Sequence, residues 1–173
     1  MVHPIKDAVS FLGGYFNDDG VNMMHDQMFA PQSPENRALF ALMEEEYVDC
    51  VIQFHGGSNA NNVFLQTDYV TEEANAATLE LTARCKAAGE SEGLSFNSNY
   101  LTPQKEGTPP PSFNLASALH HIGGAVSTIF ESNEAICDWP GPKFTYDEIL
   151  RSHAIIFEQV CKMFVERQTK VAE

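Results

Sequence analysis

Apolar residues along the chain follow two patterns, one typical of amphipathic helices and one typical of buried strands. Apolar positions at helical spacing predict four helices. The predicted helices cover 33–43, 71–88, 114–122 and 145–164. Two continuous runs rich in β-branched and apolar residues, 48–54 and 125–130, predict buried strands. Strands that alternate with helices indicate an α/β fold with helices on both faces of a mainly parallel sheet.

Capping signals support the first and the last of these helices. Ser33 is expected to be an N-cap because Pro34 follows it at the first helical position. Thr145 and Glu148 form a capping box, in which each side chain accepts a hydrogen bond from the other residue's backbone. The last helix is predicted to bury one stripe, within which His153 is interpreted as a hydrogen-bonded core residue. The stripe comprises Ile149, His153, Ile156, Phe157, Val160 and Phe164.

Composition and charge exclude several classes of protein. The 173 residues are 43% hydrophobic, and 10 basic against 24 acidic residues give a net charge of −14. This fits one globular domain or part of one, and the negative charge disfavours nucleic acid and anionic membranes as partners. No apolar run approaches the roughly 20 residues that span a bilayer, and the first residues carry no signal pattern. The sequence leaves the compartment unknown.

Both predicted strands end in residues that suit catalysis. His55 follows the first strand and is followed by two glycines, which let the backbone turn sharply beside a metal ion. Glu131 follows the second strand, where partial burial would raise the pKa of a carboxylate and favour general-base chemistry. In open α/β sheets, functional residues collect at the carboxyl ends of the strands. Each residue taken alone also fits an ordinary structural role.

Four segments along the chain carry recognisable motifs in a fixed order. They are Asn17 to Asn22, Ser33 to Glu35, Asp49 to Gly57 and Ser127 to Glu131. This order resembles the C-terminal part of the catalytic domain of the zinc carboxypeptidase (M14) family. The first segment is similar to that family's N-P-D-G-V-[DN] turn, the second to the start of its next helix, the third to its D-x-x-x-x-x-H-[SG] strand and the fourth to its T-x-x-[FY]-E strand. The resemblance extends over most of the chain.

The resemblance implies a fold, an activity and a set of site residues. The fold is a three-layer α/β/α sandwich with a mostly parallel mixed sheet, and residues 1–173 are the C-terminal portion of one incomplete carboxypeptidase-like catalytic domain. The activity is zinc-dependent hydrolysis of a peptide or amide bond. His55 is implied as a zinc ligand and Glu131 as the base that activates water, while Asn22 and His25 are implied as substrate-binding residues.

Two departures from the family pattern shape these expectations. None of the six histidines begins an H-x-x-E motif, which supplies the family's other zinc ligands. A catalytic zinc needs about three protein ligands, so the isolated chain is predicted to bind zinc weakly and to be inactive without ligands from outside it. His25 also stands at about the position of the arginine that holds a substrate's terminal carboxylate, and an imidazole lacks the two-pronged guanidinium fork.

Three alternatives follow from these departures. The substrate is a peptide or, in the runner-up hypothesis, an N-acyl amino acid, as in related deacylases. In a different class of function, a chain without the other ligands is a non-catalytic binding module. Because an incomplete sheet exposes a strand edge, the predicted macromolecular partners are the missing N-terminal half or a second copy of the chain.

Overall fold

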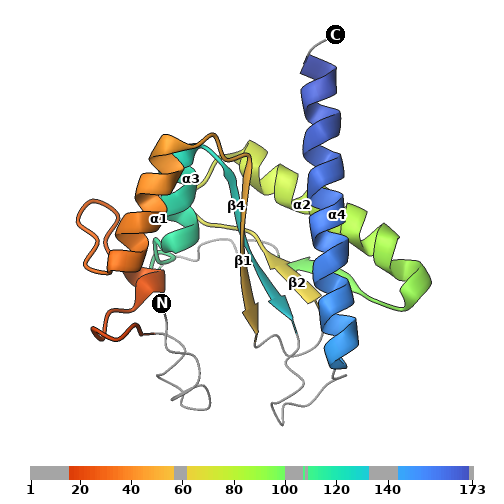
Figure 1. The fold of residues 1–173 in the computed structure, drawn as a ribbon, viewed down its shortest axis with the longest axis horizontal. Coiled ribbons are helices and arrows are strands. Elements are labelled where there is room, and N and C mark those ends of the chain that lie inside the picture. Colours follow the sequence, from red (N-terminus) through yellow and green to blue (C-terminus); the bar gives the residue numbers. More distant parts are fainter. Residues whose placement is uncertain (1–15, 57–61, 100–106, 108, 133–143, 172–173) are drawn as a thin grey trace.

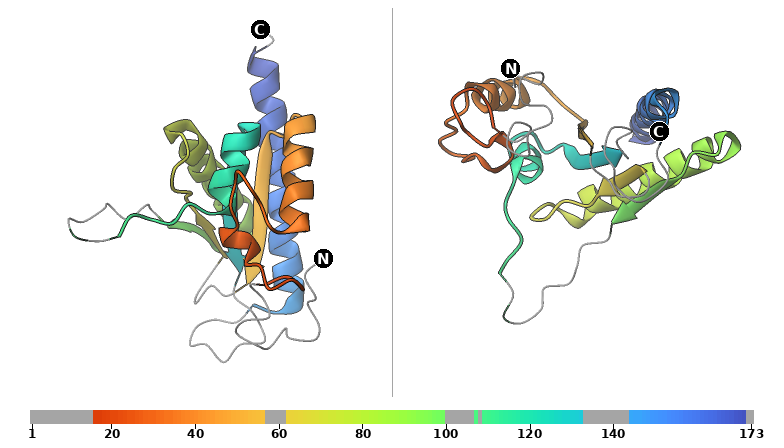
Figure 2. Two further views of the ribbon diagram at one scale, coloured as in Figure 1. Left: turned by 90° about the vertical axis from the view of Figure 1, so that its left-hand side faces the viewer. Right: turned by 90° about the horizontal axis from the view of Figure 1, so that it is seen from below.

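The computed structural model describes residues 16–56, 62–99, 107, 109–132 and 144–171, which form two layers of helices around one sheet (Figure 1). α1 and α3 cover one face of the sheet, whereas α2 and α4 cover the other (Figure 2). The helices are α1 (Pro34–Glu45), α2 (Glu72–Gly89), α3 (Leu115–Gly123) and α4 (Tyr146–Val171), with 3₁₀ turns η1 (Met23–His25) and η2 (Glu90–Glu92). The predicted α/β class is confirmed. Among the described helices, none has both the length and the apolar character needed to cross a membrane.

The sheet is mixed and mostly parallel, as predicted. Its strand order is β1-β4-β2-β3. The strands are β1 (Cys50–Gly56), β2 (Asn62–Leu65), β3 (Phe96–Asn99) and β4 (Val126–Ser132). β1 pairs with β4 in parallel and β2 pairs with β3 in parallel, whereas β2 and β4 are antiparallel. The carboxyl ends of β1 and β4 therefore lie side by side at one end of the strands. The carboxyl ends of β2 and β3 lie at the opposite end.

The predicted helix starts are confirmed by their hydrogen bonds. The backbone N–H of Asn36 donates to Ser33 Oγ at 3.0 Å. At the start of α4, the backbone N–H of Thr145 donates to Glu148 Oε2 at 2.6 Å, and the N–H of Glu148 donates to Thr145 Oγ1 at 3.3 Å. These bonds satisfy backbone donors that the first turn of a helix leaves without partners.

Two apolar clusters hold the layers together. Phe130 of β4 is fully buried at the centre of the larger cluster, which fills the space between the sheet and the α2–α4 layer. The buried members of the larger cluster are Phe64, Leu81, Cys85, Leu94, Phe96, Phe130, Phe144, Ile155, Ile156 and Met163. The smaller cluster lies between the sheet and the α1–α3 layer. Its buried members are Phe40, Met43, Ala118, Leu119 and Ala125.

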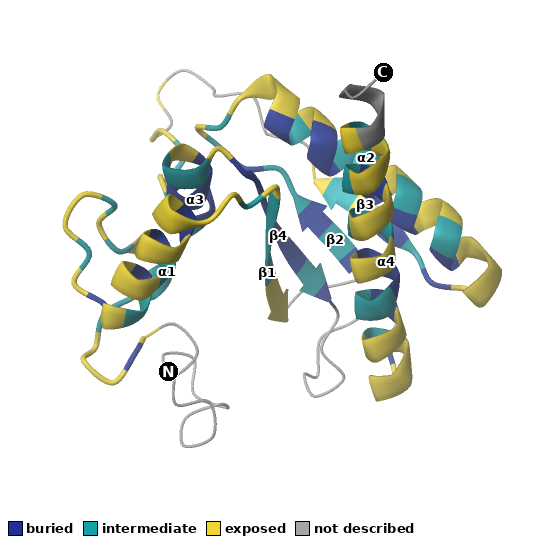
Figure 3. Ribbon diagram, turned by 45° about the horizontal axis from the view of Figure 1, so that its top comes forward, coloured by how far each residue is buried: buried dark blue, intermediate teal, exposed yellow. Residues whose placement is uncertain are grey.

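β1 differs from the buried strand that the sequence predicts. None of its residues is fully buried, and its last three residues are exposed (Figure 3). The reason is its position at the end of the strand order, where among the described residues only β4 pairs with it. A run of apolar residues predicts a strand, but it does not distinguish a central strand from an edge strand.

The buried stripe of α4 also differs from the prediction. Phe157 is 60% exposed, whereas Ile155 and Met163, which the prediction omits, are buried. His153 is not hydrogen-bonded to any described residue and instead packs its ring against Phe54 and Phe130, with centroid distances of 4.7 and 5.9 Å. The predicted positions Ile149, Ile156, Val160 and Phe164 do pack into the larger cluster. Ile155 and Met163 are buried as well, because α4 packs against α2 in addition to the apolar residues of the sheet.

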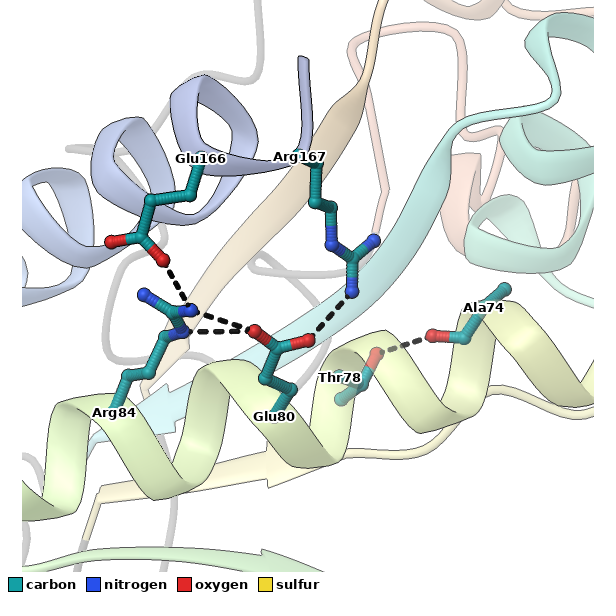
Figure 4. A network of polar contacts seen from close by, with 6 residues as sticks. All are labelled: Ala74, Thr78, Glu80, Arg84, Glu166 and Arg167. Carbon is teal, nitrogen blue, oxygen red and sulfur yellow. Dashed lines mark hydrogen bonds and ion pairs between the residues drawn. The ribbon is translucent and has the colours of Figure 1, made fainter. Parts of the chain in front are cut away.

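Ion pairs connect α2 with α4 across the surface of that layer (Figure 4). The Glu80 carboxylate accepts hydrogen bonds from Arg84 at 2.9 Å and from Arg167 at 2.8 Å. Arg84 also pairs with Glu166 at 2.8 Å. Partly exposed pairs of this kind each contribute about 0–1 kcal/mol, so the apolar cluster beneath them contributes more to stability.

Candidate active site at the carboxyl ends of β1 and β4

His55 and Glu131, the two residues singled out from the sequence, lie side by side in the sheet. They are Cα partners in the parallel β1–β4 pair. Neighbouring strands are about 4.8 Å apart, and partners in a parallel pair point to the same face. The structure therefore brings an imidazole and a carboxylate together at one edge of the sheet, although 75 residues separate them in the sequence.

The pair lies on the face of the sheet that α1 and α3 cover. Successive residues of a strand point to opposite faces. Phe54 and Phe130, the residues just before His55 and Glu131, contact each other at 5.7 Å between ring centroids and belong to the α2–α4 side. Val51, which shares its face with His55, packs into the α1–α3 cluster.

Partial burial shifts the pKa values of the two side chains in opposite directions. Desolvation raises the pKa of the Glu131 carboxyl and lowers the pKa of the His55 imidazole, even though His55 is exposed. Among the described residues, neither side chain has a hydrogen-bond or ion-pair partner. The surroundings thus favour a neutral imidazole with a free lone pair beside a carboxylate that binds a proton more readily than usual.

We expect the lowered pKa of His55 to be visible in solution. An NMR titration of the imidazole should give a midpoint below the ordinary value of about 6.5. Folding lowers the pKa of His55, so the unfolded chain binds a proton at this residue more readily than the folded protein does. The contribution of His55 to the free energy of unfolding is therefore fully present above the unfolded-state pKa, and it is lost as the pH falls through the folded-state pKa. A midpoint at or above the ordinary value would contradict the environment described for His55.

The described residues do not complete a metal site. No group of three or more His, Cys, Asp or Glu side chains is placed to hold a metal ion in the described part of the chain. His55 fits the role of one zinc ligand because its pKa shift favours the neutral form that a metal requires. The described residues therefore fit one zinc ligand, His55, and one neighbouring base, Glu131. Further zinc ligands would have to come from residues outside the described part of the chain.

Asn22 and His25, implied as substrate-binding residues, lie in and beside η1. The backbone N–H of Met24 donates to Asn22 Oδ1 at 3.1 Å, so the side chain of Asn22 caps this turn. His25 ends the turn and is exposed. η1 packs against α3 and so lies on the same side of the sheet as the pair (Figure 2). No hydrogen bond or ion pair between described residues joins His25 to His55 or Glu131.

Asp26 is a positioning residue that the sequence did not reveal. Its carboxylate accepts backbone hydrogen bonds from Gln27, Gln32 and Ser33 at 2.8 to 3.0 Å, and Asn36 also donates to it. Burial raises the pKa of Asp26, but these hydrogen bonds outweigh that effect and lower it overall. Asp26 therefore attaches the segment that carries His25 to the start of α1.

All four arginines of the sequence have other partners. Arg37 donates to the carbonyl oxygens of Pro31 and Gln32. The other three form ion pairs on the α2–α4 side of the sheet, as described for Arg84 and Arg167; Arg151 binds Glu92 at 2.7 Å. The structure therefore places no guanidinium beside His55 and Glu131 that would hold a substrate carboxylate.

Gln53 is a second residue that sequence reasoning missed. It precedes His55 by two positions and so shares its face of β1. Its Nε2 is buried and has no hydrogen-bond partner among the described residues. A buried amide donor without a partner is uncommon, because it carries the full cost of desolvation. Gln53 could have been found from the sequence, because side chains of a strand alternate between the two faces and Gln53 lies two positions before His55.

His120, by contrast, has a structural role. Its Nδ1–H donates to the carbonyl oxygen of Ala125 at 2.8 Å. Its Nε2 accepts a hydrogen bond from the backbone N–H of Thr71 at 3.4 Å, which requires the neutral ring. Both ring nitrogens are therefore used to connect α3 with the loops around it.

Comparison of the chain with known protein families and with curated proteins finds no match. Functional inference depends on the arrangement of His55 and Glu131 and on the resemblance of the surrounding motifs.

Proposed function

We propose that this chain contributes half of the active site of a zinc carboxypeptidase-like hydrolase. The observation that carries the proposal is the pairing of His55 with Glu131 at the carboxyl ends of neighbouring parallel strands. In this site His55 is a metal ligand and Glu131 is the general base. When bound, zinc would polarise the carbonyl of the substrate and lower the pKa of water.

Glu131 performs the proton transfers of the proposed reaction. Its Oε atoms accept a proton from the attacking water, and the carboxylic acid later gives that proton to the nitrogen of the leaving amine. Desolvation supports this role because the raised pKa of Glu131 brings the carboxylate closer to working pH. The absence of other described partners keeps both of its oxygens available for water.

The remaining metal ligands are proposed to come from chain that adds to the sheet beside β1. The outer edge of β1 has no partner strand among the described residues, and His55 lies at its carboxyl end. A strand added in parallel at this edge would end next to His55, where its last residues or the loop after it would complete the site. Residues 1–173 would then be the C-terminal portion of one catalytic domain.

The substrate is proposed to be a peptide or an N-acyl amino acid. Hydrolysis of either breaks an amide bond, for which a metal-activated water and a base suffice. All four arginines bind other groups, so no guanidinium fork is left to hold a substrate carboxylate. Recognition of the substrate by His25 and Asn22 is therefore favoured.

Zinc content provides the direct test of the proposed function. We expect the protein extended by the reading frame that precedes Met1 to bind one zinc ion per chain, and the 173-residue chain alone to bind it weakly. Replacing His55 by alanine in the extended protein should weaken zinc binding about tenfold or more, because one of about three protein ligands is lost. Metal analysis after dialysis against a weak chelator measures both expectations.

The matched control for this test is His121→Ala, which removes another exposed histidine on the same side of the sheet. It should leave the zinc content unchanged. An extended protein that holds no zinc, or one whose zinc content is the same with and without His55, would contradict the proposal.

A non-catalytic binding module is the second candidate, and the incomplete ligand set of the described residues favours it. In that case the extended protein would contain no metal. Its thermal unfolding would also be cooperative, with the same midpoint in the presence and absence of a chelator, since no metal would contribute binding energy to the folded state.

A further inference from the structure

α4 carries a second apolar stripe, on a side of the helix that faces away from the core. Its members follow one another at intervals of four or seven residues, so they share one face of the helix, and none of them is acidic or basic. Four of them are between 56% and 76% exposed, and the cysteine among them is exposed as well. The members of this outer stripe are Tyr146, Leu150, Phe157, Cys161 and Val165.

The outer stripe borders the unpaired edge of β1. Phe157 contacts Phe54 of β1 with 5.5 Å between ring centroids, and Phe54 is itself partly exposed. Another side of α4 packs against α2, which contacts β3 at the far end of the strand order. α4 therefore lies on the β1 side of α2 (right-hand view of Figure 2). The outer stripe and the edge of β1 form one continuous surface.

The outer stripe has the length and the spacing of a surface on which a helix packs. It runs from residue 146 to residue 165, which at a rise of 1.5 Å per residue is about 30 Å of helix. Apolar positions at intervals of four and seven residues form the row against which a second helix interdigitates. Single apolar residues are ordinary on a surface, whereas a contiguous apolar stripe of this length marks a contact with another element.

A strand added beside β1 would need cover on the same face as this stripe. Parallel strands are usually buried on both faces by helices. On this face Phe157 and His153 of α4 pack against Phe54 of β1, and none of the described helices lies beyond α4 on that side. A helix that covered the added strand would therefore lie next to α4, against the outer stripe.

We propose that the outer stripe of α4 is covered by an amphipathic helix from the chain that adds a strand beside β1. This inference rests on the proposed function, because it describes the same completing chain: besides metal ligands, that chain contributes a helix on the α2–α4 side. A second copy of the 173-residue chain fits this surface less well, because each copy carries a net charge of −14 and the two would repel each other. The covering helix removes from water the apolar side chains that the 173-residue chain exposes.

Cys161 is a native reporter of whether the outer stripe is covered. It is exposed, whereas Cys85 is buried and burial raises the pKa of Cys50 to about 12, so these two thiols react slowly with alkylating reagents. Metal-free protein is treated with iodoacetamide, and modification of the peptide that contains Cys161 is followed by mass spectrometry. We expect modification to be at least about tenfold slower in the extended protein than in the 173-residue chain, because a covered thiol reacts only when its cover opens.

Equal rates of Cys161 modification in the two proteins would overturn the inference. Protection that sets in as the concentration of the 173-residue chain rises would identify a second copy as the occupant, and would overturn it as well.

Leu150→Glu places a charge on the outer stripe and tests the contact independently. It should lower the urea midpoint of the extended protein and raise its rate of Cys161 modification, because a carboxylate would be buried beneath the covering helix. The urea midpoint of the 173-residue chain should stay nearly unchanged, since Leu150 is in contact with water there. Lys162→Glu is the matched control, because Lys162 is exposed on the same helix outside the stripe, and it should change neither measurement. A loss of equal size in both proteins would contradict the covering helix.

Failure of this inference can be distinguished from failure of the proposed function, because neither measurement uses metal or turnover. An extended protein that protects Cys161 but holds no zinc would overturn the proposed function and leave the covering helix standing. An extended protein that holds zinc while Cys161 reacts freely would overturn this inference alone.

Discussion

Glu131→Gln is expected to abolish hydrolysis by the extended protein while its zinc content remains unchanged. Glutamine has nearly the same shape as glutamate but cannot accept a proton at the pH of the reaction. General-base catalysis contributes about 10²–10⁴-fold to rate, so kcat should fall by at least that range. Because Glu131 is not proposed as a metal ligand, metal analysis should still find the same zinc content as in the unmodified protein.

The same substitution is expected to raise stability at neutral pH. Desolvation raises the folded-state pKa of Glu131, so stability from this group is present below the unfolded-state pKa and is lost as the pH rises through the folded-state pKa. At pH 7 the unmodified protein carries a partly desolvated carboxylate, whereas glutamine carries no charge. Urea unfolding at pH 7 should therefore show Glu131→Gln to be the more stable protein, and the difference should shrink near pH 4.

Glu44→Gln is the matched control for both effects, because Glu44 is an exposed carboxylate on α1. It should change neither kcat nor the pH dependence of unfolding. Full activity of Glu131→Gln would remove the base from the proposed mechanism. A variant that is less stable at pH 7 would show instead that the ionised carboxylate has stabilising partners.

Local signals made the helices predictable. The cap of α1 at Ser33 and the capping box of α4 at Thr145 are both formed by residues close together in the sequence, and both are present in the structure. β2 and β3 escaped prediction because each has only four residues and includes polar side chains. Such short strands are stabilised by pairing with distant chain, which a local pattern does not encode.

The candidate site could be predicted only in part, for the same reason. The sequence indicated that His55 and Glu131 each follow a strand, but the contact between those strands comes from their long-range register. The cleft lined by Gln27, Met28, Phe29, Phe113 and His121 could not be predicted from the sequence. Its lining residues come from three separate segments: the segment after η1, the loop before α3 and the end of α3. The positive φ of Tyr69 is likewise a property of the assembled fold, since no local preference places a tyrosine there.

Phe130→Ala is expected to cause the largest loss of stability of any single substitution considered. Phe130 is fully buried in β4, between the two strands that flank it. Its ring lies 5.0 Å from that of Phe64, 5.7 Å from that of Phe54 and 6.3 Å from that of Phe96. Removing a ring from such a core costs about 3–5 kcal/mol, because apolar contacts are lost and a cavity remains. Urea unfolding followed by circular dichroism measures this loss.

The position of Phe130 in β4 makes Phe130→Ala informative beyond the size of its effect. The residue precedes Glu131 in β4, so a cavity there would loosen the register that places Glu131 beside His55. We therefore expect the NMR midpoint of His55 to move toward its ordinary value in any Phe130→Ala protein that remains folded. In the 173-residue chain, Phe157→Ala, at the 60% exposed position of α4, should cost less than about 1 kcal/mol and leave that midpoint unchanged. Equal losses for the two variants would mean that β4 is not the centre of the core.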